Sequence, residues 1–382
     1  MTYVSSKYLK IRPKFDKIGR KNVDWTKGVA MRRFDYTPLE TRVWDTDIVN
    51  MIGKIHECKG RQAVWKGKKS AELTRLIEIA KIQSTEASNK IEGIVTTSAR
   101  MKKLFAEKTM PRNRDEDEIM GYRDVLETIH ENYEYIPIKP TYILQLHRDL
   151  LKKAKLSFAG HFKNCQNYIN ETLPDGTNIT RFVPVEPYDT PRAVEELCEA
   201  YERARSRENI DSLLLIPIFL NDFLCIHPFN DGNGRMSRLL TLLLLYQNGY
   251  DVGKYISVEK QIEKTKDLYY TALQEAGIGW HEGNNDPVPF IRYMLQVILA
   301  CYAEMEERIG TVSETGGRIS AYDKVKAYAG EKIGPFTGAD VAAYCPGIGR
   351  SSVLAALKKL TEEGRIEKRG VGRNTFYVRI DK

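Results

Sequence analysis

Apolar residues recur three and four positions apart along most of the chain between Pro38 and Gly310. The stretches 71–83 and 140–154 show this pattern clearly. Such spacing places apolar side chains on one face of an α-helix. Because apolar residues make up 42% of the sequence, the helices can also bury a substantial core. We therefore expect a mainly α-helical protein.

One region interrupts the helical pattern. Residues 160–187 are rich in β-branched, aromatic and turn-forming residues, and Pro174-Asp175-Gly176 is a reverse-turn signal. This composition predicts a β-hairpin.

The last part of the chain is organised differently. Residues 310–318 are small and polar and include glycine, which is typical of a linker between domains. Residues 319–382 then predict helices, a tight turn and two short β-segments, in the order of a winged helix-turn-helix. We accordingly divide the chain into an amino-terminal helical region (1–110), a core (111–309), the linker and the winged helix.

The formal net charge of +8 is unevenly distributed. Residues 1–33 hold ten Lys or Arg and two Asp or Glu, and residues 317–382 hold thirteen and seven, which leaves −6 for residues 34–316. The basic surplus therefore belongs to the two ends of the chain. It bears on possible nucleic-acid contact by the ends and says little about the middle.

Cysteine usage and hydropathy indicate the cellular setting. The six cysteines form no CxxC pair and share no spacing with histidines, which disfavours a disulfide framework or a zinc site. The amino terminus lacks a signal-like apolar run, and we expect no membrane span. A reducing, cytoplasmic setting is the expectation.

The most specific text is the segment His227-Pro-Phe-Asn-Asp-Gly-Asn-Gly-Arg-Met-Ser-Arg238, which lies between two apolar stretches. Gly232 and Gly234 flank Asn233, so backbone N–H groups can converge on an anion at the start of the following helix. Arg235 and Arg238 are three apart and can share a face toward phosphate oxygens. The loop thus predicts a phosphate cradle.

Two further residues of the segment add chemistry. Asp231 is a hard carboxylate that suits a magnesium ion bridging phosphates. His227 titrates near neutrality and can take a proton from a hydroxyl. Each feature alone is typical of an ordinary turn, but together in twelve residues they indicate a catalytic site.

The segment resembles the signature H-P-F-x-D/E-G-N-G-R-x-x-R of the Fic (filamentation induced by cAMP) family at every defined position. The resemblance extends to the hairpin, which is similar to the family's flap, and to residues 256–273, which are similar to the helix that follows the core. It implies transfer of AMP from ATP to a Ser, Thr or Tyr hydroxyl of a protein, with Mg²⁺ as cofactor.

The resemblance also implies site roles. His227 is the expected general base and Asp231 the metal ligand. The expected nucleotide-binding residues lie in the same segment, apart from Tyr269, for which an adenine pocket and the core are equally suitable: Asn230, Gly232, Asn233, Gly234, Arg235, Arg238 and Tyr269.

A second motif lies near residue 90, at the end of an expected helix over about 70–93. Ser88 and Glu92 are four apart and share a face, and Gly93 is a natural helix C-cap. The string resembles the family's inhibitory motif S/T-x-x-x-E-G/N. On this resemblance Glu92 pairs with Arg238 and holds the enzyme in a self-inhibited state.

Several alternatives stay open from the sequence. The site could carry out a related phosphate or nucleotide transfer, or remove AMP. The winged helix, with Arg350, Lys358, Lys368 and Arg373, could bind DNA, and the chain would then be a regulator with a nucleotide-sensing core. A homodimer and self-modification are further expectations from the family.

Overall fold

The computed structural model describes residues 32–380, except residues 69, 107, 173–175, 311–320, 333, 346–347, 371 and 373–374. Most of the basic amino-terminal stretch, the predicted turn at Pro174-Asp175, most of the predicted linker and Arg373 therefore lie outside the described residues.

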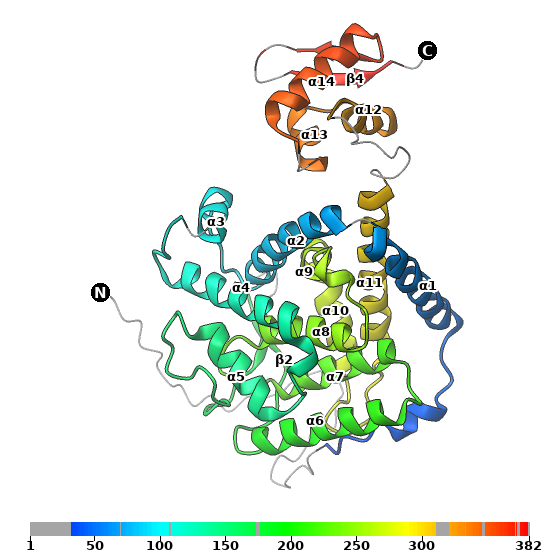
Figure 1. The fold of residues 1–382 in the computed structure, drawn as a ribbon. Coiled ribbons are helices and arrows are strands. Elements are labelled where there is room, and N and C mark those ends of the chain that lie inside the picture. Colours follow the sequence, from blue (N-terminus) through cyan, green and yellow to red (C-terminus); the bar gives the residue numbers. More distant parts are fainter. Residues whose placement is uncertain are drawn as a thin grey trace.

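The expectation of a mainly α-helical protein is confirmed (Figure 1). The helices of the body are α1 (Thr46–Lys68), α2 (Ser70–Ile91), α3 (Ser98–Phe105), α4 (Arg114–Asn132), α5 (Pro140–Leu151), α6 (Thr190–Arg207), α7 (Ser212–Ile226), α8 (Asn233–Gln247), α9 (Val258–Lys264), α10 (Lys266–Gly277) and α11 (Val288–Gly310), with short 3-10 turns at Thr37–Thr41, Tyr133–Tyr135 and Val252–Lys254.

Helices α7 and α8 form the centre of the body. Every residue of α7 except Ser212 and Leu224 is buried, and in α8 only Gly234 and Gln247 are not. A helix that is apolar on all sides must be surrounded by other elements. Here α6, α10 and α11 pack against α7, while α2 and α4 pack against α8 (Figure 1). The 227–238 segment joins the two central helices, so its position is set by the core.

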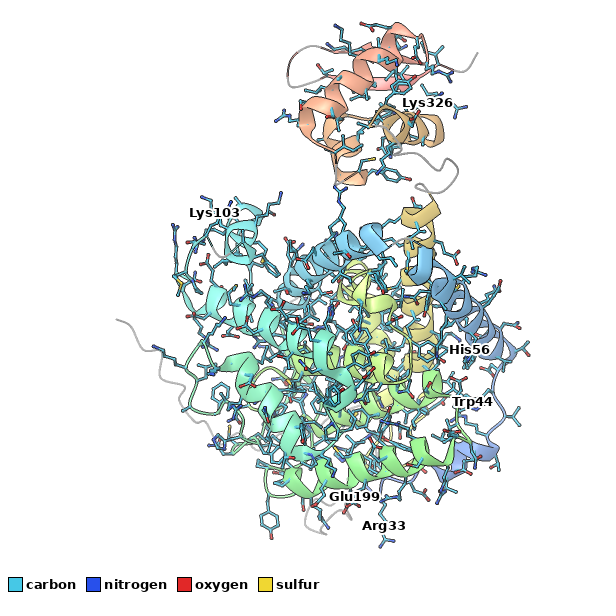
Figure 2. The ribbon with its side chains drawn as sticks, viewed as in Figure 1. Arg33, Trp44, His56, Lys103, Glu199 and Lys326 are labelled. Carbon is cyan, nitrogen blue, oxygen red and sulfur yellow. The ribbon has the colours of Figure 1, made fainter. Side chains whose placement is uncertain are left out.

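Helix α2 is the expected helix that ends in the second motif. It packs against α4, α8 and α9, and the chain turns away at Gly93, whose φ of 82° favours glycine. Helix α3 follows and projects beside α2, with Lys103 on its exposed side (Figures 1 and 2).

The predicted hairpin forms from β1 (Ile169–Thr172) and β2 (Asn178–Phe182). The strands are antiparallel, with Asn170 opposite Thr180 and Thr172 opposite Asn178. Residues 160–168 lack strand structure, so the hairpin is shorter than residues 160–187.

The prediction of a single helix over residues 256–273 is wrong in one respect. The segment contains two helices, α9 and α10, which meet at Thr265. Thr265 has φ −123° and ψ 34°, outside the helical range, and its hydroxyl donates to the carbonyl of Gln261. The break turns α10 toward α7 and α11.

Helix α11 is long and apolar enough to span a membrane, which the sequence expectation had excluded. Within its 22-residue segment Val288–Ile309, an 18-residue window has a mean hydropathy of 1.2. The helix packs against α1, α7, α9 and α10, and 61% of the window is buried within the protein. It also carries charged residues such as Arg292 and Glu304, so we assign α11 to the protein core.

Residues 321–380 have their own hydrophobic core. Helices α12 (Ala321–Glu331), α13 (Gly338–Tyr344) and α14 (Arg350–Glu362) precede strands β3 (Ile366–Arg369) and β4 (Phe376–Arg379). The strands pair antiparallel, and Phe336 bridges to Tyr377 on β4. This element order agrees with the one expected from the sequence.

Candidate active site

His227 caps the end of α7 in a conformation that is rare for a residue with a side chain. Its φ of 52° and ψ of 62° are left-handed, and its backbone N–H donates to the carbonyl of Phe223 at 3.0 Å. The ring Nδ1 lies 3.2 Å from the carbonyl oxygen of Leu224. Since a carbonyl only accepts, Nδ1 carries the hydrogen and Nε2 keeps its lone pair. Burial lowers the pKa of His227 to about 4, so the ring is a neutral base near pH 7.

Two residues that the sequence analysis missed support the backbone around His227. The Lys163 ammonium donates to the carbonyl of Ile226 at 3.1 Å, and its backbone N–H donates to Pro228 at 2.8 Å. The Asn167 amide donates to the carbonyls of Phe229 at 3.0 Å and His227 at 3.4 Å. Lys163 is buried, and burial lowers its pKa to about 8. No local pattern marks these residues, because Lys163 and Ile226 are 63 positions apart.

Phe229 holds the loop against His147 of α5. Its ring stacks on His147 of α5 with centroids 3.7 Å apart. The His147 Nδ1 accepts from the Gly160 N–H at 3.0 Å, so Nε2–H donates to the Asp231 carbonyl at 3.0 Å. Sequence analysis missed His147 as well.

The Asn233 side chain is engaged within the loop. Its Oδ1 accepts from the Phe229 N–H at 2.9 Å, and its Nδ2 donates to the Phe229 carbonyl at 2.7 Å. The side chain is also buried. In this structure the side chain therefore clamps the loop, and the backbone N–H is the group of Asn233 that can face an anion.

The first turn of α8 lacks a side-chain cap and is suited to bind an anion. Its N-cap is Gly232, whose φ of 85° favours glycine, and no side chain caps the turn. Uncapped N–H groups and the helix dipole attract negative charge. At Gly234 a Cβ would lie 2.2 Å from the Glu92 Oε1, so only glycine lets that carboxylate rest against the turn.

Arg235 and Arg238 contact different helices. Arg235 is 1% exposed, and its Nη1 lies 2.6 Å from Glu118 Oε2 of α4. Arg238 is 2% exposed, and its Nη2 lies 2.7 Å from Glu92 Oε1. Each buried guanidinium is thus held by a carboxylate from another element, and sequence analysis missed Glu118.

Ser88 completes the contact between α2 and Arg238. Its Oγ accepts from Arg238 Nε at 2.8 Å, and its carbonyl accepts from Nη2 at 2.9 Å. Burial alone would raise the pKa of Glu92, but the adjacent Arg238 holds that pKa below its usual value. The expected ion pair between Glu92 and Arg238 is therefore present, with the carboxylate ionised.

Two expected nucleotide-binding residues have other contacts. Tyr269 is 3% exposed and packs among Tyr270, Phe290 and Tyr293, an arrangement typical of a core tyrosine. Its neighbour Tyr270 is 44% exposed and is the more accessible aromatic ring. The Asn230 amide donates to Asn164 Oδ1 at 3.1 Å, at the edge of the loop.

Asp231 suits the magnesium ion that the family implies. Among the described residues no group of three His, Cys, Asp or Glu side chains could hold a metal without other ligands. Magnesium at phosphates needs only one or two protein carboxylates, and the Asp231 side chain is 45% exposed beside the open turn of α8. A single carboxylate with phosphate oxygens therefore fits this site.

A family model described as Fic/DOC matches residues 137–245, which include α5, the hairpin, His227 and most of α8. Residues 137–245 therefore match a Fic domain. The match ends before α9 and begins after α2, so it covers the loop and not the Glu92 motif.

Named relatives agree with the Fic domain. The protein adenylyltransferase fic-1 of Caenorhabditis elegans is 28% identical over 184 residues, covering 47% of this chain and 32% of the relative. The protein adenylyltransferase Fic of Drosophila erecta is 26% identical over 293 residues, covering 75% and 52%. The chain thus spans about a third to a half of the length of these relatives.

Solved structures share the fold. A Fic family protein from Desulfovibrio desulfuricans G20 has a TM-score of 0.59 at 21% identity, over 89% of this chain and 98% of that one. Fic-1 from C. elegans has a TM-score of 0.56 at 22% identity, over 72% and 74%. The Fic fold therefore extends beyond the segment that the family model matches.

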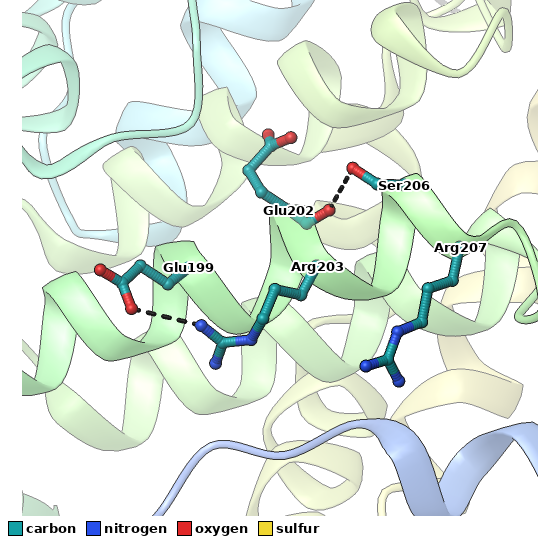
Figure 3. A pocket seen from close by; sticks show the side chains of 5 residues that line it. All are labelled: Glu199, Glu202, Arg203, Ser206 and Arg207. Carbon is teal, nitrogen blue, oxygen red and sulfur yellow. Dashed lines mark hydrogen bonds and ion pairs between the residues drawn. The ribbon is translucent and has the colours of Figure 1, made fainter.

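A depression on α6 lies on another element and has a different character. It is lined by charged and polar side chains of one helix, and Figure 3 shows Glu199 and Arg203 paired along its side. Glu199 also points outward from α6 in Figure 2. None of its lining residues belongs to the 227–238 segment.

Proposed function

We propose that the protein is an adenylyltransferase that transfers AMP from ATP to a Ser, Thr or Tyr hydroxyl of a protein. The observation that carries this proposal is the neutral His227 ring, whose Nε2 keeps its lone pair, in the same loop as the uncapped first turn of α8. Five residues thus separate the base that can deprotonate a hydroxyl from the backbone N–H groups that can bind a phosphate. The adenylyltransferase names of the relatives agree with this reaction.

The residues divide the reaction between them. The backbone N–H groups at the start of α8 hold the α-phosphate, and Arg235 and Arg238 hold the β- and γ-phosphates. His227 Nε2 accepts the proton of the acceptor hydroxyl while the hydroxyl oxygen forms a bond to the α-phosphorus. The bond from the α-phosphorus to the bridging oxygen breaks, and pyrophosphate leaves. Catalysis of this kind is mainly positioning and charge stabilisation. Asp231 would hold a magnesium ion at the phosphates, which would supply neutralising positive charge.

The hairpin provides a way to present a protein substrate. Within the part of the chain that the structure describes, strands β1 and β2 pair only with each other, so each has an outer edge without a strand partner. An extended target segment can add to such an edge through backbone hydrogen bonds, which requires little side-chain sequence. The hydroxyl is then brought to His227 with limited sequence preference.

We also propose that the resting protein is self-inhibited by Glu92. The carboxylate binds Arg238 and lies against the α8 turn at Gly234, where it repels phosphate oxygens. ATP must compete with Glu92 for the guanidinium, and a nucleotide that binds beside the carboxylate is displaced from the productive position.

The test is incubation of the wild type, Glu92→Gly and His227→Ala proteins with ATP and Mg²⁺, followed by intact mass measurement. We expect an added AMP on Glu92→Gly, less on the wild type and none on His227→Ala. Equal gain in all three would contradict the role of His227. A gain the size of a phosphate would indicate the alternative of phosphate transfer.

The winged-helix region supports a second candidate function, contact with DNA. Arg350, Ser351 and Lys358 are exposed on α14, the helix that a winged helix-turn-helix places in the major groove. Lys368 and Arg369 on β3 are exposed as well. Binding of the full chain to duplex DNA that weakens with salt and with Arg350→Ala supports this function, and binding that ignores the substitution opposes it.

A further inference from the structure

Four charged side chains form a closed ring beside the phosphate cradle. Arg114 Nε lies 2.6 Å from Glu118 Oε1, and Glu118 Oε2 lies 2.6 Å from Arg235 Nη1. Arg235 Nη2 lies 3.5 Å from Asp231 Oδ1, and Asp231 Oδ2 lies 3.5 Å from Arg114 Nη2. The charges alternate around the ring, and two helices contribute: α4 supplies Arg114 and Glu118, and α8 supplies Arg235.

Arg114 differs from the other two arginines at the cradle. Its side chain is 58% exposed, whereas those of Arg235 and Arg238 are 1% and 2% exposed. Glu118 holds the Arg114 Nε closely, while the contact of its Nη2 with Asp231 is long. The guanidinium is therefore oriented at one nitrogen and keeps N–H groups for an incoming anion.

The net charge of the side chains around the phosphate cradle also favours a third arginine as a ligand for a triphosphate. Three guanidiniums, those of Arg114, Arg235 and Arg238, lie among three carboxylates, those of Asp231, Glu118 and Glu92. Asp115 is a further acid near Arg114. A triphosphate carries several negative charges, so the buried arginines alone, each paired with a carboxylate, offer it little net positive charge.

We propose that Arg114 binds the β- and γ-phosphates of the nucleotide, and that Glu118 is a positioning residue for both Arg114 and Arg235. The inference rests on the proposed use of ATP and adds a third phosphate-binding arginine from outside the 227–238 segment. The Arg114 guanidinium exchanges its long contact with Asp231 for phosphate oxygens, while its Nε stays on Glu118.

The experiment measures the binding of ATP, ADP and AMP in Mg²⁺ by calorimetry. The parent carries Glu92→Gly and His227→Ala, so the cradle is accessible and the nucleotide is not consumed. Arg114→Gln is added to this parent. The matched control is Arg203→Gln on α6, because Arg203 is similarly exposed at 56% and also pairs with a glutamate four residues away.

We expect Arg114→Gln to weaken binding of ATP and ADP about tenfold, the effect of one charge-assisted contact, and to leave AMP within about twofold. Arg203→Gln should match the parent for all three nucleotides. Unchanged ATP affinity in Arg114→Gln overturns the inference and leaves the proposed function standing. Equal losses for ATP and AMP also overturn it, because they indicate a damaged site. A parent that binds no ATP contradicts the proposed function itself.

Glu118→Gln in the same parent tests the positioning role. The amide keeps the size of the side chain but loses its charge, so both guanidiniums are held less firmly. Because loss of the Glu118 charge also makes the cradle more positive, the test is the coupling between the two substitutions: we expect Arg114→Gln to weaken ATP binding less in Glu118→Gln than in the parent. Additive losses would show that Arg114 does not depend on Glu118 and would overturn the positioning role.

Discussion

The protonation state of His227 is set by its surroundings. An exposed histidine titrates near pH 6.5, but burial lowers the pKa of this ring to about 4. The Nδ1–H bond to Leu224 at the same time points Nε2 away from the backbone. The left-handed His227 and its buried support from Lys163 thus produce a base that is ready at neutral pH.

We expect the acid limb of the pH–rate profile for AMP transfer by Glu92→Gly to have its midpoint near pH 4. The base must be neutral, so kcat/KM falls as the pH drops through the pKa of the folded protein. Samples held at each pH and returned to pH 7 before assay separate this effect from unfolding. A midpoint near 6.5 in protein that recovers fully would contradict the lowered pKa.

Glu118 also contributes to the stability of the fold. Replacing it with Gln leaves the buried Arg235 without its nearest carboxylate, and breaking a buried ion pair costs about 3 kcal/mol. Urea unfolding of Glu118→Gln in the otherwise wild-type chain measures this loss. Glu127→Gln on the same helix is the control, because Glu127 is 47% exposed in its pair with Lys81 and should cost less than about 1 kcal/mol. Similar stabilities for the two variants would show that the pair is not structurally important.

At the scale of elements, α2 is fastened where its motif meets α8. The Lys266 ammonium of α10 donates to the Ile91 carbonyl at 2.7 Å, and Lys90 lies 2.6 Å from Glu263 of α9. The Lys266 contact satisfies an end carbonyl of α2 and adds positive charge at a helix C-terminus. The split into α9 and α10 therefore supplies both fastenings of the helix that carries Glu92.

We expect Lys266→Met to raise self-modification, because the end of α2 then moves more freely and Glu92 leaves Arg238 more often. The same substitution in a Glu92→Gly background should not raise activity further. Lys260→Met on α9 is the control, because it removes a nearby lysine that pairs with Glu263 and not with the end of α2. Intact mass over time measures all variants, and activation of the Glu92→Gly background by Lys266→Met would point to another mechanism.

At the scale of the whole molecule, buried neutral histidines make the stability of the fold depend on pH. Burial lowers the pKa of His147 and His227 to about 4 and that of His130 to about 3. Unfolded, each titrates near 6.5. Their contribution to stability is therefore complete above pH 6.5, and it declines as the pH falls toward 4 and 3.

We accordingly expect the melting temperature to be lower at pH 5 than at pH 7. His147→Gln keeps one donor and one acceptor for Asp231 and Gly160 but does not titrate, so its melting temperature should fall less between these pH values. Thermal unfolding at both pH values makes the comparison. An equal or larger fall in His147→Gln would show that His147 does not contribute to the acid sensitivity.

Local sequence patterns predicted the elements and part of the site. Periodicity identified the helical body, and the turn and β-branched residues of 160–187 identified the hairpin, because both signals depend on near neighbours in the chain. The 227–238 segment and the Ser88–Glu92 string were recognisable for the same reason: each places its functional residues within a few positions.

Only the tertiary structure determined which groups those residues meet. Lys163 and Asn167 under His227, His147 against Phe229, and Glu118 and Arg114 beside Arg235 come from elements far away in the sequence. The packing of α2 and α4 against α8 decided that Arg235 and Arg238 contact different helices, and the packing of α10 against α11 buries Tyr269. Long-range packing and burial set these contacts and the pKa of His227, and neither quantity is encoded in the spacing of residues along the chain.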